Sequence, residues 1–216
     1  MLPSLSPNPA VQEIQPQVQR KLGRVLILIQ QYEALLKAMI IESEIEVKVD
    51  ADGGAAAVDA FRKKRMEQYR NMTLGMLVRE LHETFLRTSP LPDDDSEPVL
   101  CPGKDPLRLR HHIQLAPEKA ALIEADLQSL VTLRNSLVHH FIQQFDIFSV
   151  PGCQVALNYL EESYRTVETA LNQLREWEYH MRQIRKTLSE FLQSQQFSDF
   201  MNLDESNDAE FFNGKS

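Results

Sequence analysis

Apolar residues recur three and four positions apart along most of the chain, which is the spacing of amphipathic α-helices. The first such stretch has Pro16 in its opening turn, where a missing amide N–H costs nothing. It should end between residues 46 and 50, because the Gly53-Gly54 turn follows. The next stretch predicts one helix over residues 58–87. The two apolar stripes consist of Leu22, Val25, Leu26, Ile29, Leu36, Met39 and Ile40, and of Phe61, Met66, Tyr69, Met72, Met76, Leu77 and Leu81.

The second half of the chain predicts two more helices. One begins at Pro117, continues to residue 145 and ends before the segment "SVPGC". The other is not interrupted by glycine or proline, so it should be longer than an average globular helix. Its stripe consists of Leu157, Leu160, Tyr164, Val167, Leu171, Leu174, Trp177, Met181, Ile184, Leu188 and Phe191. Residues 201–216 are acidic and lack periodicity, so we expect a flexible tail there.

Residues 88–117 separate the second and third predicted helices and contain six prolines and three consecutive aspartates. Proline removes a backbone donor, so this segment should be a long loop that holds at most a short strand pair. Loops of this length are usually functional or disordered. The pattern as a whole predicts an all-α fold: an antiparallel four-helix up-down bundle, with one domain over residues 11–200 and the proline-rich loop inserted in it.

Composition and charge narrow the function. An apolar fraction of 43% and a charged fraction of 25% are ordinary for a globular protein. The net charge of −8 should repel polyanions, so any contact with nucleic acid requires a local basic patch. Cys101 and Cys153 are the only cysteines, which argues against a disulfide framework. The N-terminus lacks a signal-peptide pattern and no apolar run is long enough to span a membrane, so we expect a cytoplasmic protein without a membrane partner.

The densest basic stretch is "FRKKRMEQYR" in the second predicted helix. It is either a solvated helix face or a surface that follows an RNA backbone, with the tyrosine stacking on a base. The residues of the second hypothesis are Arg62, Lys63, Lys64, Arg65, Tyr69 and Arg70. His111 and His112 are adjacent, so they project in different directions, and no Cys or carboxylate stands at ligand spacing. We therefore expect no metal site and no cofactor.

The segment "TLRNSLVHHF" in the third predicted helix contains an arginine, an asparagine and two histidines within an apolar run. A hydrogen-bonded structural role is one explanation. On an α-helix Asn135 and His139 share a face, but Arg134 lies roughly 140° around the axis from His139. A single straight helix therefore should not bring that Arg and His together. Two copies crossing in a symmetric dimer could, with Leu133, Leu137, Val138 and Phe141 as an apolar seat.

The sequence "LRNSLVHHF" resembles the Arg-polar-x-x-x-His motif of the HEPN family (higher eukaryotes and prokaryotes nucleotide-binding domains), in the variant with four residues between Arg and His. Its position on the third long helix agrees with that family, and "LGRVLILIQQYEALLKAMI" resembles a HEPN first helix. The resemblance implies a metal-independent endoribonuclease that acts as a homodimer, in which Arg134 and His139 of both chains line one RNA-binding cleft.

The chemistry of RNA cleavage suits these residue types. Imidazole is the side chain that titrates near neutral pH, so His139 could take the proton of the attacking ribose 2′-OH. The guanidinium of Arg134 offers a fixed charge and several donors for the phosphorane oxygens. Asn135 could orient the histidine or hold a phosphate oxygen. His140 also falls within the spacing that the family allows, although Asn-x-x-x-His favours His139.

Two further residues refine the resemblance. The family often has a polar residue at mid-height on the first helix, facing the cleft, which makes Glu33 a candidate accessory residue. Alternatively Glu33 forms an exposed ion pair with Lys37, four positions later. A toxin branch of the family has a tyrosine two residues after the histidine that a partner enzyme adenylylates. Phe141 occupies that position and has no hydroxyl, so that route of regulation is in doubt.

The resemblance implies a toxin or a phage-defence or stress effector, with RNA as substrate and a cognate antitoxin or regulatory protein as partner. The alternative, from a different class, is a catalytically silent HEPN-like helical module that binds a protein partner or a nucleotide. A long fourth helix, net acidity and an unusual loop suit this second hypothesis as well.

Overall fold

The computed structural model of the chain describes residues 8–47, 54–87 and 107–196. Most of these residues are helical, which confirms the predicted all-α class, and the predicted helix start at Pro117 is also confirmed. The helices are α1 (Pro9–Glu42), α2 (Gly54–Tyr69), α3 (Leu74–Thr84), α4 (Pro117–Asn135), α5 (Phe141–Gln144) and α6 (Val150–Leu192), with a π-helical turn, η1 (Ser136–His140), between α4 and α5.

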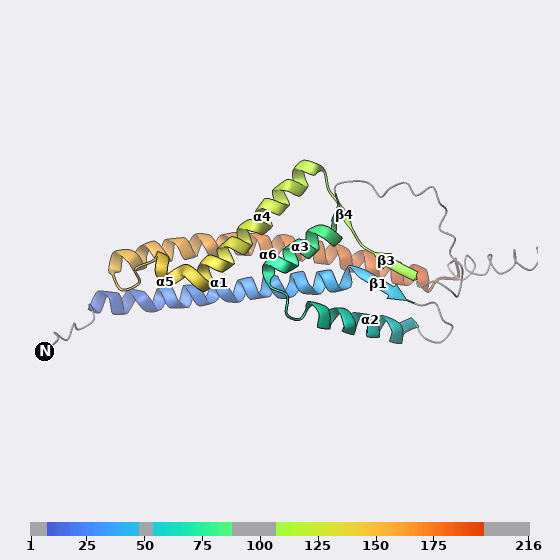
Figure 1. Ribbon diagram of the computed structural model, residues 1–216, viewed down its shortest axis with the longest axis horizontal. Helices are drawn as coiled ribbons and strands as arrows, with labels where there is room; N and C mark the ends of the chain where they lie inside the picture. The colour runs from blue at the N-terminus through green and yellow to red at the C-terminus, as the bar shows by residue number, and fades with distance from the viewer. Residues whose placement is uncertain (1–7, 48–53, 88–106, 197–216) are drawn as a thin grey trace, which may run out of the picture.

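Helices α1 and α6 lie side by side along the long axis of the molecule (Figure 1). Polar caps fix where each begins. The Asn8 side chain accepts a hydrogen bond from the Ala10 amide at the start of α1, and the Ser149 hydroxyl accepts one from the Gly152 amide at the start of α6. With 43 residues, α6 has the exceptional length that its sequence predicts. Pro16 lies inside α1 rather than in its first turn, because the helix begins seven residues earlier, at Pro9.

The directions of α1 and α6 correct the predicted up-down order. Lys21 forms an ion pair with Glu161, and Glu42 forms one with Arg185. Because the residue numbers of both partners rise together, the two helices run in the same direction. In a four-helix up-down bundle the first and last helices would be antiparallel. The colours of Figure 1 show the same parallel course.

The cause is a break in the predicted second helix. It is split at residues 70–73 into α2, which runs back along α1, and α3, which reverses again, so the chain makes one more reversal than expected. Thr73 has an extended backbone and is the N-cap residue of α3. Its backbone oxygen accepts from the Leu77 amide, while its side chain makes no capping hydrogen bond. Two members of the predicted stripe, Met66 and Met76, are exposed as a result.

Short strands connect the helices. β1 (Glu44–Val47) pairs antiparallel with β3 (Leu107–Arg110), and β2 (Leu86–Arg87) pairs parallel with β4 (Ile113–Gln114). Because β1 follows directly, α1 ends at Glu42 rather than near residue 50. The two strands within the predicted loop, β3 and β4, pair with β1 and β2 outside it and not with each other. The rest of that loop, residues 88–106, and the predicted tail at 201–216 lie outside the described residues.

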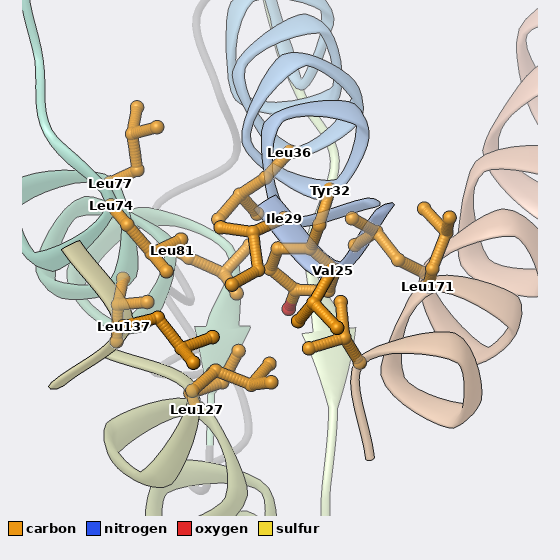
Figure 2. Packing of buried hydrophobic residues seen from close by; sticks show 14 of the residues in the cluster. Val25, Ile29, Tyr32, Leu36, Leu74, Leu77, Leu81, Leu127, Leu137 and Leu171 are labelled. Carbon is orange, nitrogen blue, oxygen red and sulfur yellow. The ribbon is translucent and has the colours of Figure 1, made fainter. Parts of the chain in front are cut away.

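One buried apolar cluster joins α1, α3, α4, η1 and α6 (Figure 2). The residue of η1 in this cluster is Leu137, which is 3% exposed. It anchors the π-helical turn in the core and so fixes the direction of the polar side chains on either side of it. The labelled members of the cluster are Val25, Ile29, Tyr32 and Leu36 of α1, Leu74, Leu77 and Leu81 of α3, Leu127 of α4, Leu137 of η1 and Leu171 of α6.

Candidate functional site

The segment "TLRNSLVHHF" leaves the α-helical geometry at Ser136, where the five-residue π-helical turn η1 begins. A π-helix bonds residue i to residue i+5, so residues five apart come to the same side of the helix. Arg134 and His139 are five apart, and Nη1 of the arginine lies 3.4 Å from Nε2 of the histidine. The expectation that one chain cannot bring them together is therefore wrong. It assumed a regular α-helix.

A hydrogen-bond network accompanies the π-helical turn. The Ser136 hydroxyl donates to Oε1 of Gln144 at 2.8 Å and lies 3.3 Å from the hydroxyl of Tyr159 on α6. Leu137 within the turn and Phe141 just after it are buried, at 3% and 4% exposed. The irregular turn is thus tied to the core by two apolar side chains and to α6 through a hydroxyl contact.

Arg134 has two further partners. Its Nη1 donates to Oδ1 of Asn135 at 3.2 Å, and its Nε lies 3.6 Å from Oε1 of Glu33 on α1. The expected Asn135 contact with His139 is not among the hydrogen bonds of the described residues; the amide oxygen turns to the arginine instead. The Arg134 and Glu33 side chains are 28% and 25% exposed, so their ion pair orients the guanidinium more than it stabilises the fold.

The sequence left two roles for Glu33, and the structure favours the one at the site. The other role required an ion pair with Lys37. The Lys37 ammonium instead donates to the backbone oxygen of Arg70, at 3.0 Å. Four of the five predicted catalytic residues, Glu33, Arg134, Asn135 and His139, are therefore brought together.

The fifth, His140, faces elsewhere. Its Nδ1 lies 3.3 Å from Oε1 of Gln143, and its ring meets that of His139 edge-on with centroids 6.2 Å apart. Both histidines are exposed, so both are reachable from solvent. Of the two, the structure places only His139 against the guanidinium.

Comparison of the chain with protein-family models, curated proteins and solved structures finds no match.

Of the four residues expected to form an apolar seat for a dimer, Val138 alone is exposed. Leu137 and Phe141 belong to the core of their own chain, and Leu133 is half-buried against it. Val138 and Ile142 are the apolar side chains that solvent reaches beside the histidines, at 47% and 70% exposed. A partner surface at this site would meet these two.

The predicted RNA-binding stretch of α2 is only partly accessible. Arg65 is buried: Nη1 lies 2.5 Å from a Glu44 carboxylate oxygen and Nη2 donates to the Ile40 oxygen at 2.6 Å. Tyr69 is 2% exposed, and its hydroxyl donates to Glu80, so its ring cannot stack on a base. The exposed basic residues of this stretch are Arg62, Lys63, Lys64 and Arg70. Arg62 lies near Glu42 and Asp59, and Arg70 lies near Glu67.

A second basic cluster was not anticipated. Arg20, Lys21 and Arg24 line an open groove of about 390 Å³ between α1 and α6. Arg20 and Arg24 are four positions apart, and this spacing in the sequence could have indicated that they share one face of α1. In this groove Lys21 is already paired with Glu161, so the cluster is partly neutralised.

His111 and His112 act as structural residues. Nδ1 of His112 lies 3.0 Å from the Thr84 backbone oxygen, and the His111 ring packs on Phe85. Burial of His111 lowers the pKa of its imidazole, and the charge of the neighbouring His112 lowers it further.

Among the described residues no three His, Cys, Asp or Glu side chains gather as a possible metal site. No helix in this part of the chain is both long and apolar enough to cross a bilayer.

Proposed function

We propose that this protein is a metal-independent endoribonuclease of HEPN type that acts as a homodimer. The observation that supports it is the 3.4 Å approach of Arg134 Nη1 to His139 Nε2 within one chain, with Glu33 and Asn135 holding the guanidinium. A fixed cation beside an exposed imidazole is the pair of groups that 2′-OH attack on phosphate requires.

In the proposed reaction the His139 imidazole takes the proton of the ribose 2′-OH as the hydroxyl oxygen attacks the neighbouring phosphorus. Arg134 donates to the phosphorane oxygens, whose negative charge grows in the transition state. The bond from phosphorus to the 5′ oxygen then breaks, and that oxygen takes a proton from an imidazolium. One imidazole acts as base and a second as acid, so His139 of two copies would complete the reaction.

The first prediction is a homodimer with η1 and α5 at its interface. Replacing Ile142, which is 70% exposed, with Asp should shift the protein toward monomer, because a carboxylate would be buried in an apolar contact. Mass measurement at tens of micromolar tests this. Leu122→Asp, at an exposed apolar residue of α4, is the matched control and should leave the mass unchanged. A wild-type protein that is only monomeric would refute the dimer.

The second prediction concerns the products and the metal requirement. Cleavage should persist in EDTA and should leave 2′,3′-cyclic phosphate ends, because the nucleophile is the hydroxyl of the RNA itself. Mass spectrometry of a short RNA after digestion identifies the ends. Products with a 5′ phosphate, or cleavage that stops when divalent ions are chelated, would contradict the proposed mechanism.

The alternative is a catalytically silent HEPN-like module that binds a protein or nucleotide. One observation favours this alternative. The Glu33 carboxylate pairs with the Arg134 guanidinium, so less positive charge is left to bind a phosphate. A protein that binds RNA or a partner without cleaving it would support this alternative. If cleavage occurs, an RNase of this kind is best suited to a toxin, phage-defence or stress system, with a cognate antitoxin or regulator to restrain it.

A further inference from the structure

A groove of about 420 Å³ lies between α4 and α6. The residues of α4 that line it precede Arg134 in the sequence. Its walls are mostly apolar and include Leu127 and Leu130 of α4 and Ala170, Leu174 and Trp177 of α6. Tyr32 of α1 also lines it. This volume is within the range of small-molecule sites, about 300–1,000 Å³, which are typically apolar with a few placed polar groups.

Tyr32 is the buried polar residue of the lining. The other uncharged polar residues are exposed, namely Ser129, Thr166, Thr169 and Gln173. Tyr32 is 3% exposed, and its hydroxyl makes no hydrogen bond to any residue in the described part of the chain. Figure 2 shows Tyr32 on α1 within the apolar cluster that also includes Leu127 of α4 and Leu171 of α6. The hydroxyl oxygen is not among the fully buried polar atoms that lack a partner, so it is not sealed from solvent, and an acceptor in the groove that Tyr32 lines can reach it. The phenol thus has an unused hydrogen bond directed at the groove.

We propose that this groove binds an uncharged ring-containing molecule with one hydrogen-bond acceptor, which receives the hydrogen bond of the Tyr32 hydroxyl. The site is independent of the proposed ribonuclease activity. The groove lining does not include Glu33, Arg134 or His139.

The electrostatics of the groove support an uncharged ligand. Its charged lining residues are Asp126 and Arg165, and both are exposed. The Arg165 side chain is 75% exposed, and its Nε lies 3.3 Å from a Glu161 oxygen. Burial raises the pKa of Tyr32, so its hydroxyl remains protonated and able to donate. The two charged residues of the lining are exposed, so water screens them, and a charged ligand would gain little from either.

The chain provides its own reporter for this site. Trp177 is the single tryptophan, is half-buried and lines the groove. Titration of the full-length protein with quinoline, a two-ring molecule with one acceptor nitrogen, should change Trp177 fluorescence to saturation. In Tyr32→Phe the quinoline affinity should fall by roughly 2- to 10-fold, the value of one hydrogen bond. Naphthalene, which has the same shape without the acceptor, should bind both proteins equally.

Two controls make the test decisive. Ala170→Phe fills the groove and should abolish the response to both probes. Thermal unfolding of Tyr32→Phe should match the wild type, because the lost hydroxyl has no protein partner. Equal quinoline affinity in wild type and Tyr32→Phe, or a quinoline response that persists in Ala170→Phe, would overturn the proposal. So would wild-type protein whose Trp177 fluorescence does not respond to quinoline.

Discussion

Replacing Arg134 or His139 with alanine should lower RNA cleavage by at least about 100-fold, the usual loss when a general base or a donor to a developing oxyanion is removed. The free energy of unfolding should change by less than about 1 kcal/mol. Both expectations follow from exposure. The arginine side chain is 28% exposed, the histidine lies at the surface, and their contacts are with exposed or half-exposed groups. Cleavage of a labelled RNA and denaturant unfolding on the same samples test both.

Three variants sharpen this comparison. His140→Ala should retain most of the activity, because that ring contacts Gln143 and not the guanidinium. His180→Ala, at an exposed histidine of α6, controls for the removal of any surface imidazole. Glu33→Gln should leave a partial activity, since it loosens the orientation of Arg134 without removing the cation. If the Arg134 and His139 variants unfold more easily but cleave normally, the two residues are structural.

The largest loss of stability is expected at Arg65. Its guanidinium is buried between α1 and α2, bonds Glu44 and the Ile40 oxygen, and lies 5.3 Å from the centre of the Tyr69 ring. Arg65→Ala removes the cation while the acid and the carbonyl remain in place, which typically costs about 3–5 kcal/mol. Denaturant unfolding monitored by circular dichroism measures the cost.

Arg62 provides the matched control on the same helix. Its side chain is 49% exposed and lies 3.9 Å from a Glu42 oxygen, so Arg62→Ala should cost less than about 1 kcal/mol. Similar losses for the two variants would mean that the Arg65 network contributes no more than a surface ion pair. A role of Arg65 in RNA binding would instead appear as weaker RNA binding at unchanged stability.

The sequence predicts the helices well and their arrangement poorly. The spacing of apolar residues reflects which side of a helix is buried, so it predicts that α1, α4 and α6 are helices. The break before α3 had a signal, since Asn71 and Thr73 are residues that favour turns and caps, but the apolar spacing continued across it. That one missed turn reversed the direction expected for α6 relative to α1.

The candidate site was predicted in its residues but not in its geometry. The residue types at positions 134 and 139 indicate proton transfer and charge stabilisation, whichever helix geometry carries them. The π-helical turn has no comparable pattern in the sequence, because it depends on the burial of Leu137 and Phe141 and on contacts with distant residues such as Tyr159. The groove beside Tyr32 was missed for the same reason: it is created by the angle between two helices.

The π-helical turn also bears on how this motif is aligned with others. A π-helical turn contains one residue more than an α-helical turn, so a single inserted residue is absorbed locally and the helix beyond it keeps its place. An Arg and a His separated by four residues across a π turn thus occupy nearly the positions of a pair separated by three on an α-helix. Insertions and deletions at residues 136–140 need not disrupt the pair. An alignment that penalises every gap within this helix would then separate chains whose side chains superimpose.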